Sequence, residues 1–85
     1  RAFGLQGPPS GLLRYAQSDK RLKKNIKLVG KSKNNINIYE FDYKDGEGRY
    51  RGVMAQELPD YATALFNGYL GVDYSLIDVP FERIA

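Results

Sequence analysis

Apolar residues first recur at a helical spacing. Between residues 18 and 29 the chain is polar and basic, with apolar residues at intervals of three or four: Leu22, Ile26 and Val29, beside Leu28. This interval favours one face of a helix. Ser18 or Asp19 is suited to cap the helix at its start, and Gly30 is suited to end it. The pattern therefore predicts a short helix, then a loop over residues 31–35.

The next apolar stretches are typical of strands. Residues 36–43 are rich in Ile, Tyr and Phe, and their apolar parity shifts between Ile38 and Tyr39. Such a shift indicates a bulge or burial on both faces. A turn-forming run, Asp45-Gly46-Glu47-Gly48, connects this stretch to residues 49–55. Two antiparallel strands are the simplest interpretation.

Turn signals divide the rest of the chain. Pro59 favours one or two helical turns within residues 56–64. Asn67-Gly68, between two apolar stretches, predicts a hairpin because both positions of a type I′ turn need positive φ. Ser75 resembles a helix cap, but Pro80 would interrupt any long helix that began there.

These elements predict an α+β fold of small antiparallel β-hairpins with short helices. Residues 1–17 are dense in Gly and Pro, which suits a connector at the end of a preceding region. We therefore divide the chain into this connector and one domain over residues 18–85. A lone chain of 85 residues is marginally stable and usually relies on disulfides, metals or partner subunits. The chain has no Cys and no His, so oligomerisation is the favoured support, and we expect no metal or other cofactor.

Charge is divided unevenly along the chain. Nine of the 13 Lys and Arg residues fall within residues 1–33, beside the single acid Asp19, whereas nine of the ten acids follow. Seven basic residues crowd one short stretch: Lys20, Arg21, Lys23, Lys24, Lys27, Lys31 and Lys33. This patch suggests nucleic-acid binding, yet a basic run is more often a solvated face, so nucleic acid is an unlikely partner. No apolar run approaches the length that spans a bilayer, so no membrane is expected.

The sequence also gives only weak support to carbohydrate binding and to glycosidic chemistry. The aromatic residues suggest a carbohydrate platform, but packing in a core is their commoner use: Tyr39, Phe41, Tyr43, Tyr50, Phe66, Tyr69 and Tyr74. Among the acids, Glu40, Glu57 and Asp73 are candidates for glycosidic chemistry. Nothing in the sequence sets two of these carboxyl groups at the separation that such chemistry needs.

Ser18 and Lys23 are the pair with chemical potential. A serine hydroxyl becomes a nucleophile when a base removes its proton, and a lysine can act as that base if its pKa is lowered. We expect the neighbouring cations to lower the Lys23 pKa, because like charge disfavours the protonated form. Five residues is not a helix-face interval, so the pair needs a turn or a subunit contact to meet. The alternative is that Ser18 caps a helix and Lys23 is solvated.

Four blocks in order resemble the endosialidase-type C-terminal chaperone peptidase family. They are Ser18-Asp19-Lys20-Arg21-Leu22-Lys23-Lys24-Asn25-Ile26, Ile38-Tyr39-Glu40-Phe41-Asp42-Tyr43, Gly52-Val53-Met54-Ala55-Gln56-Glu57-Leu58 and Val72-Asp73-Tyr74-Ser75. The likeness runs from Ser18 to about Ile84. Members commonly end in long helices that embrace the stem, whereas this chain ends at Ala85 soon after Pro80, a departure from the family pattern.

The resemblance implies a function. Such domains sit at the C-terminus of bacteriophage tail spikes and tail fibres, assemble as homotrimers, promote folding of the upstream β-rich stem and then release themselves by autoproteolysis. It implies that Ser18 is the nucleophile of a single-turnover serine peptidase, that Lys23 is the general base and that the cleaved bond joins Gln17 to Ser18. Asn25 is a candidate oxyanion or orienting residue.

The same likeness sets expectations for assembly and location. The product would be a tail-fibre or tail-spike precursor of the virion, assembled in the host cytoplasm, and residues 1–17 would be the end of its stem. If Lys23 is correctly placed only in the trimer, cleavage would report completed assembly. The alternative is a trimerisation or capping module that does not cleave and stays on the virion fibre.

Overall fold

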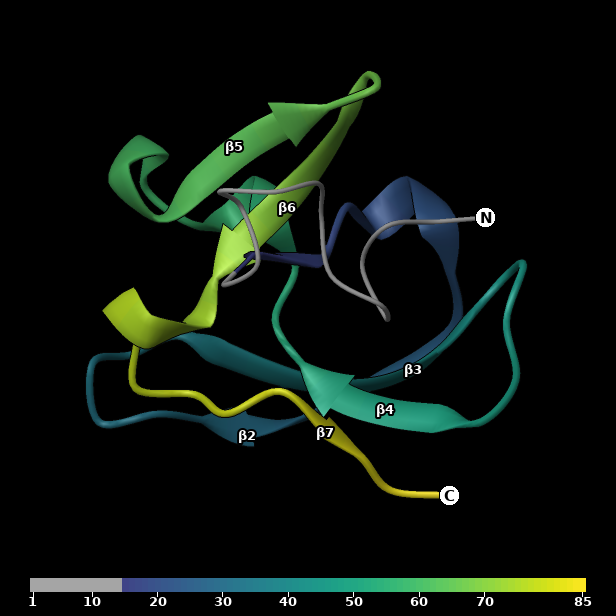
Figure 1. Cartoon of the computed structure of the whole chain (residues 1–85). Coiled ribbons are helices and arrows are strands. Elements are labelled where there is room, and N and C mark those ends of the chain that lie inside the picture. The colour runs from purple at the N-terminus through teal and green to yellow at the C-terminus, as the bar shows by residue number, and fades with distance from the viewer. Residues whose placement is uncertain (1–14) are drawn as a thin grey trace.

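The described residues, 15–85, form two antiparallel β-sheets in a computed structural model (Figure 1). The four-stranded sheet has the order β2-β3-β4-β7, with bounds β2 Lys23–Lys31, β3 Asn37–Tyr43, β4 Arg49–Gly52 and β7 Glu82–Arg83. The three-stranded sheet has the order β1-β6-β5, with bounds β1 Tyr15–Gln17, β6 Tyr69–Asp73 and β5 Thr63–Phe66. Of the connector expected over residues 1–17, the first 14 residues lie outside the described residues, and the last three form β1.

Helical structure is limited to single 3-10 turns, so the fold of the described part is mostly β rather than α+β. These turns are η2 Lys20–Leu22, η3 Ala55–Glu57, η4 Asp60–Ala62 and η5 Tyr74–Leu76. The turn expected near Pro59 is confirmed, since η4 begins directly after that proline. At η5 the cap is the Asp73 side chain, which accepts from the Ser75 backbone N–H, and not Ser75 itself.

The helix predicted for residues 18–29 is wrong beyond its first turn. Asp19 caps η2, and from Lys23 the chain runs as β2, which pairs antiparallel with β3. Two irregularities in the register, between Lys24 and Lys27 and between Leu28 and Gly30, change the parity of the strand. A bulged strand can therefore carry apolar residues at helix-like intervals. Gly30 lies within β2, opposite Ile38, and ends no helix.

Both predicted hairpins are confirmed. Asn67 and Gly68 join β5 to β6 with φ of 50° and 83°, the two positive values that the sequence predicted. The turn around Gly48, with φ of 89°, joins β3 to β4. The parity shift at Ile38 and Tyr39 reflects packing on both faces of β3, since Tyr39 packs against the Phe41 cluster and Ile38 against the Val53 cluster.

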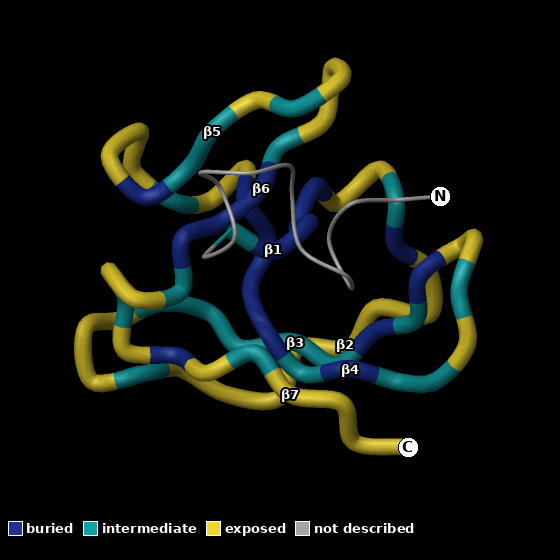
Figure 2. Tube along the Cα trace, viewed as in Figure 1, coloured by how far each residue is buried: buried dark blue, intermediate teal, exposed yellow. Residues whose placement is uncertain are grey.

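The segment between β4 and η3 connects the sheets through the protein's interior. Gly52, Val53, Met54 and Ala55 are all buried (Figure 2). Met54 packs with the aromatic residues Phe41, Tyr43 and Tyr50 on the four-stranded sheet. Val53 and Ala55 pack instead with Val72 of β6 and with Val79. This crossing segment therefore touches both halves of the core, and most of the aromatic residues serve the packing role expected of them.

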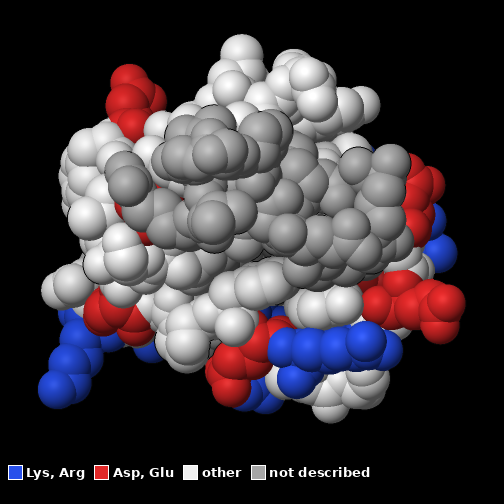
Figure 3. Space-filling view, in the orientation of Figure 1, with Lys and Arg blue, Asp and Glu red and all other residues white. Residues whose placement is uncertain are grey.

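Charged side chains of both signs lie beside one another over the four-stranded sheet (Figure 3). Two ion pairs link its strands, Arg49 with Asp42 and Arg51 with Glu40, each at 3.0 Å. Of the seven basic residues of the patch within residues 20–33, six are exposed and only Lys23 is buried. Within residues 15–85, no helix is long and apolar enough to cross a membrane.

Candidate functional site

Ser18 and Lys23 meet inside a single chain. Ser18 follows β1 of the three-stranded sheet, and Lys23 begins β2 of the other. The η2 turn between them reverses the chain, so Lys23 Nζ lies 2.8 Å from Ser18 Oγ, and both residues are buried. Each atom also lies 2.6 Å from the carbonyl oxygen of Val53, in the crossing segment. Both sheets and the segment between them thus build the site.

Burial sets the charge of Lys23. Loss of water around the amine lowers its pKa from 10.5 to about 7, although Asp19 and Glu57 act in the opposite direction. The Phe41 ring, whose centroid is 3.9 Å from Nζ, also favours the charged form. The cause is therefore desolvation and not the neighbouring cations that the sequence suggested. Near neutral pH a large fraction of the amine is unprotonated.

The peptide bond before Ser18 is held on both sides. The Tyr43 hydroxyl donates to the Gln17 carbonyl oxygen at 2.5 Å, and the Ser18 N–H donates to the Leu70 carbonyl at 3.1 Å. Tyr43 is the direct cross-strand partner of Lys23, so the two side chains project from the same face of the sheet. Burial raises the pKa of Tyr43, which keeps its hydroxyl protonated as a donor.

Asn25 lies away from this centre. Its side-chain amide donates to Asp42 at 2.7 Å on an exposed part of β2, and its φ of 52° belongs to the first irregularity of that strand. The donor that contacts the Gln17 carbonyl is Tyr43. Sequence reasoning missed Tyr43 as a site residue, because only the register between β2 and β3 shows that it faces Lys23.

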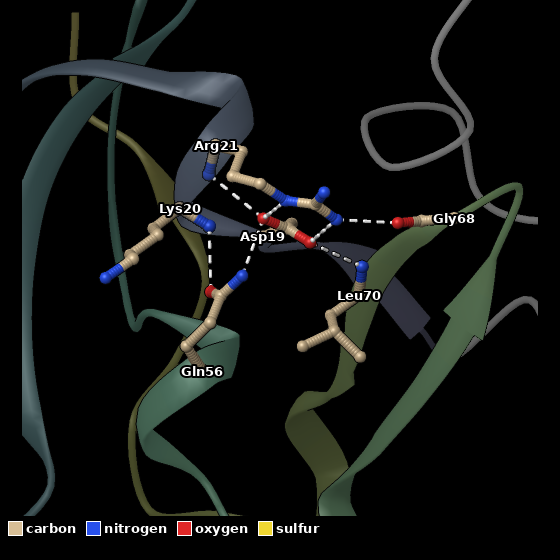
Figure 4. Close-up of polar contacts among 6 residues, drawn as sticks. All are labelled: Asp19, Lys20, Arg21, Gln56, Gly68 and Leu70. Carbon is tan, nitrogen blue, oxygen red and sulfur yellow. Dashed lines mark hydrogen bonds and ion pairs between the residues drawn. The ribbon is translucent and has the colours of Figure 1, made fainter.

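Asp19 ties the turn after Ser18 to two other elements (Figure 4). Its buried carboxylate accepts from the backbone and side chain of Arg21, from the Gln56 amide and from the Leu70 N–H. Burial opposes ionisation, but these hydrogen bonds outweigh it and hold the Asp19 pKa well below its usual range. Asp19 thereby fixes the backbone beside Ser18 against η3 and β6.

The arrangement can activate a serine. An unprotonated Lys23 amine can take the proton of the Ser18 hydroxyl across 2.8 Å, while Tyr43 polarises the adjacent carbonyl.

The acids considered for glycosidic chemistry bond to separate partners, Glu40 to Arg51, Glu57 to Tyr39 and Asp73 to Ser75. Among residues 15–85, no group of His, Cys, Asp or Glu is arranged to hold a metal.

Fold and site together define a small antiparallel β domain that buries a serine–lysine pair beside a held peptide bond. The chain belongs to the family described as chaperone of endosialidase, a peptidase family by name, whose model matches residues 18–67. The match spans more than half of the chain and begins at Ser18. No curated protein and no solved structure was found to match. The resemblance noted in the sequence is thus confirmed, while the domain boundary before Ser18 stays a prediction.

Proposed function

We propose that this chain is an intramolecular chaperone that promotes trimerisation and folding of a phage tail fibre or spike, and then cuts itself free between Gln17 and Ser18. The observation that carries the proposal is the 2.8 Å contact between Ser18 Oγ and a buried lysine amine. Family membership supports the chaperone role. We also propose that the precursor is assembled in the host cytoplasm and becomes part of the virion.

The first step is an attack within the chain. Lys23 Nζ takes the Ser18 hydroxyl proton, and Oγ forms a bond to the carbonyl carbon of Gln17. The reacting groups are covalently adjacent, so the step gains from proximity and needs no substrate binding. Tyr43 stabilises the charge that develops on the Gln17 carbonyl oxygen, in the role that the sequence suggested for Asn25.

The second step releases the domain. The bond from the Gln17 carbonyl carbon to the Ser18 nitrogen breaks, and the Lys23 ammonium returns a proton to that nitrogen. Gln17 is now an ester on Ser18 Oγ. Water hydrolyses the ester, which gives a Gln17 carboxylate, restores the Ser18 hydroxyl and leaves Ser18 as a new N-terminus. Each chain reacts once.

The exposed side of β2 supports the proposed homotrimer. β2 is the terminal strand of its sheet, and it carries three exposed apolar residues, Ile26, Leu28 and Val29, with exposed fractions of 44%, 55% and 41%. An unpaired strand edge with apolar side chains is a ready surface for a second subunit. Because Ser18 and Lys23 already meet within one chain, the partner subunits are not needed to bring the pair together.

Intact-mass measurement of the purified chain tests the proposal. We expect the wild-type chain to yield a fragment that begins at Ser18, with the complementary fragment ending at Gln17. Ser18→Ala removes the nucleophile and Lys23→Ala removes the base, so both variants should stay uncut, with a loss of at least about a hundredfold in rate. Light scattering on the same samples should give a trimer.

The outcomes separate the two candidate functions. Persistent full-length chain through long incubation, in a trimeric wild-type sample, would assign the domain to the class of modules that trimerise the fibre and stay on it. A cut at any other bond would remove Ser18 from the mechanism. A monomeric sample would contradict the assembly role.

A further inference from the structure

The Tyr74 hydroxyl lies at the same serine oxygen as Lys23, and no step above uses it. Tyr74 begins η5 directly after β6, and its hydroxyl oxygen is 3.3 Å from Ser18 Oγ. The same oxygen accepts the Val53 backbone N–H at 3.1 Å. Val53 therefore contacts the site through both of its backbone groups, its N–H to Tyr74 and its carbonyl to Ser18 and Lys23.

The direction of the hydrogen bond between the two hydroxyls follows from their partners. The Val53 N–H can only donate, so the Tyr74 oxygen accepts there and keeps its own proton for another acceptor. Ser18 Oγ is the acceptor within reach of that proton. Burial raises the pKa of Tyr74, so the proton is present over the pH range in which Lys23 titrates. Tyr74 thus donates and Ser18 accepts.

This donation matters because the single Ser18 proton has two acceptors. Val53 O lies 2.6 Å from Oγ and Lys23 Nζ lies 2.8 Å away. Transfer to Lys23 leaves negative charge on Oγ, and a hydroxyl donor aimed at Oγ stabilises that charge. Val53 O, in contrast, can only accept, so it offers no stabilisation to a charged Oγ.

Because Gly52 has no side chain, it leaves the space that the Tyr74 hydroxyl occupies. A Cβ on Gly52 would lie 2.5 Å from that hydroxyl oxygen and 3.4 Å from the ring carbon that bears it, closer than the hydroxyl can tolerate. Gly52 therefore allows the Tyr74 side chain to approach the backbone closely. Any larger residue at position 52 must push the Tyr74 hydroxyl away from Val53 and Ser18.

We propose that Tyr74 is a fourth catalytic residue beside Ser18, Lys23 and Tyr43, whose hydroxyl donates to Ser18 Oγ and stabilises the oxygen as Lys23 takes its proton, and that Gly52 provides the space for it. The inference rests on the proposed self-cleavage. Tyr74 keeps its own proton throughout, so the balance of bonds and protons given above is unchanged. Loss of one hydrogen bond to a developing charge corresponds to a roughly ten- to hundredfold slower cut.

The test is the rate of cleavage of four chains by intact mass between pH 5 and pH 11: wild type, Tyr74→Phe, Gly52→Ala and the double variant. Tyr74→Phe should lower the plateau rate and leave the midpoint of the pH profile in place, because the burial of Lys23 is kept. Gly52→Ala should slow cleavage alone but add little to Tyr74→Phe, since the atom it displaces is already absent. Tyr50→Phe, which removes a hydroxyl bonded to the Glu47 carbonyl, is the matched control and should cleave as wild type.

The results distinguish this inference from the function on which it rests. If Tyr74→Phe cleaves at the wild-type rate while Ser18→Ala stays intact, Tyr74 has no catalytic role and the proposed cleavage stands. If the midpoint for Tyr74→Phe moves up toward pH 10.5, the variant has let water reach Lys23 and the role of Tyr74 is only structural. A wild-type chain that never yields the Ser18 fragment overturns both proposals.

Discussion

At the scale of single residues, the site depends on a lysine kept where its charge is unfavourable. Lys23 is 3% exposed, and burial lowers its pKa to about 7. The folded chain therefore binds this proton more weakly than the unfolded chain does. Between pH 10.5 and pH 7 the unfolded state holds more protons, so the fold gains stability as pH rises through that window and loses it as pH falls. The lysine that we propose as the base thus lowers the stability of the fold.

This cost predicts that Lys23→Met stabilises the protein. Measured in a Ser18→Ala background, where no chain is cut, the free energy of unfolding near pH 7 should rise by about 3 kcal/mol. The relieved charge is worth about 4 kcal/mol, offset by about 1 kcal/mol for the lost hydrogen bond to Val53. Urea unfolding of the Lys23→Met chain and of its Ser18→Ala parent at several pH values measures this difference in the free energy of unfolding.

The gain should shrink as pH rises toward 10.5, because the amine of the unfolded chain then also loses its proton and folding has less charge to remove. Lys24→Met, at an exposed position on the same strand, controls for the removal of one positive charge. A Lys23→Met chain that is less stable than its parent at pH 7 would mean that Lys23 is stabilised by its partners as a cation.

The sequence could predict some of these residues and not others. Ser18 and Lys23 were identifiable from chemistry and family likeness, since no thiol or imidazole competes with them. Nothing in the pattern separates Lys23 from the exposed lysines around it, because only the fold buries one of them. Tyr43 and Tyr74 were expected to pack, and their hydroxyls reach Gln17 and Ser18 through contacts 26 and 56 residues apart in sequence.

At the scale of elements, the tight turns and the two hairpin pairings that they set were predictable, and the pairing of β2 was not. Asn67-Gly68 specifies its hairpin by backbone conformation alone. The segment after Ser18 looked helical because two irregularities in β2 shift its apolar residues from strand parity. Its true partner, β3, lies beyond a loop, and a periodicity within one segment carries no information about such a partner.

Asp19 connects three of these elements, so we predict that Asp19→Asn both destabilises the fold and alters the pH profile. One carboxylate oxygen becomes an NH₂ group that faces donors, at a cost of about 3 kcal/mol. Asp19 also raises the Lys23 pKa, so its neutralisation should move the midpoint of cleavage to lower pH. Thermal unfolding and cleavage rate measure the two effects.

Asp45→Asn provides the comparison, because Asp45 is exposed in the turn between β3 and β4. It should change neither quantity. An Asp19→Asn chain with the wild-type unfolding midpoint would show that the hydrogen bonds to the Asp19 carboxylate in Figure 4 contribute no net stability.

At the scale of the whole molecule, the contact between Ser18 and Lys23 is a product of how the two sheets join. Ser18 comes from one sheet, Lys23 from the other, and Val53 from the segment that passes between them. A chain that has not brought its sheets together has no site, so cleavage should follow folding. This order suits the proposed role of a chaperone that is removed after folding, and such removal would make the proposed fibre hard to unfold by the route that formed it.

The central claim is that a buried, neutral Lys23 drives the cut before Ser18, and the cleavage rate as a function of pH tests it most directly. The rate at which the fragment from Ser18 to Ala85 appears should rise along one sigmoid with its midpoint at about pH 7, the pKa of Lys23 in the fold. A midpoint near pH 10.5, the value of a hydrated lysine, or a rate that does not depend on pH, would contradict the account.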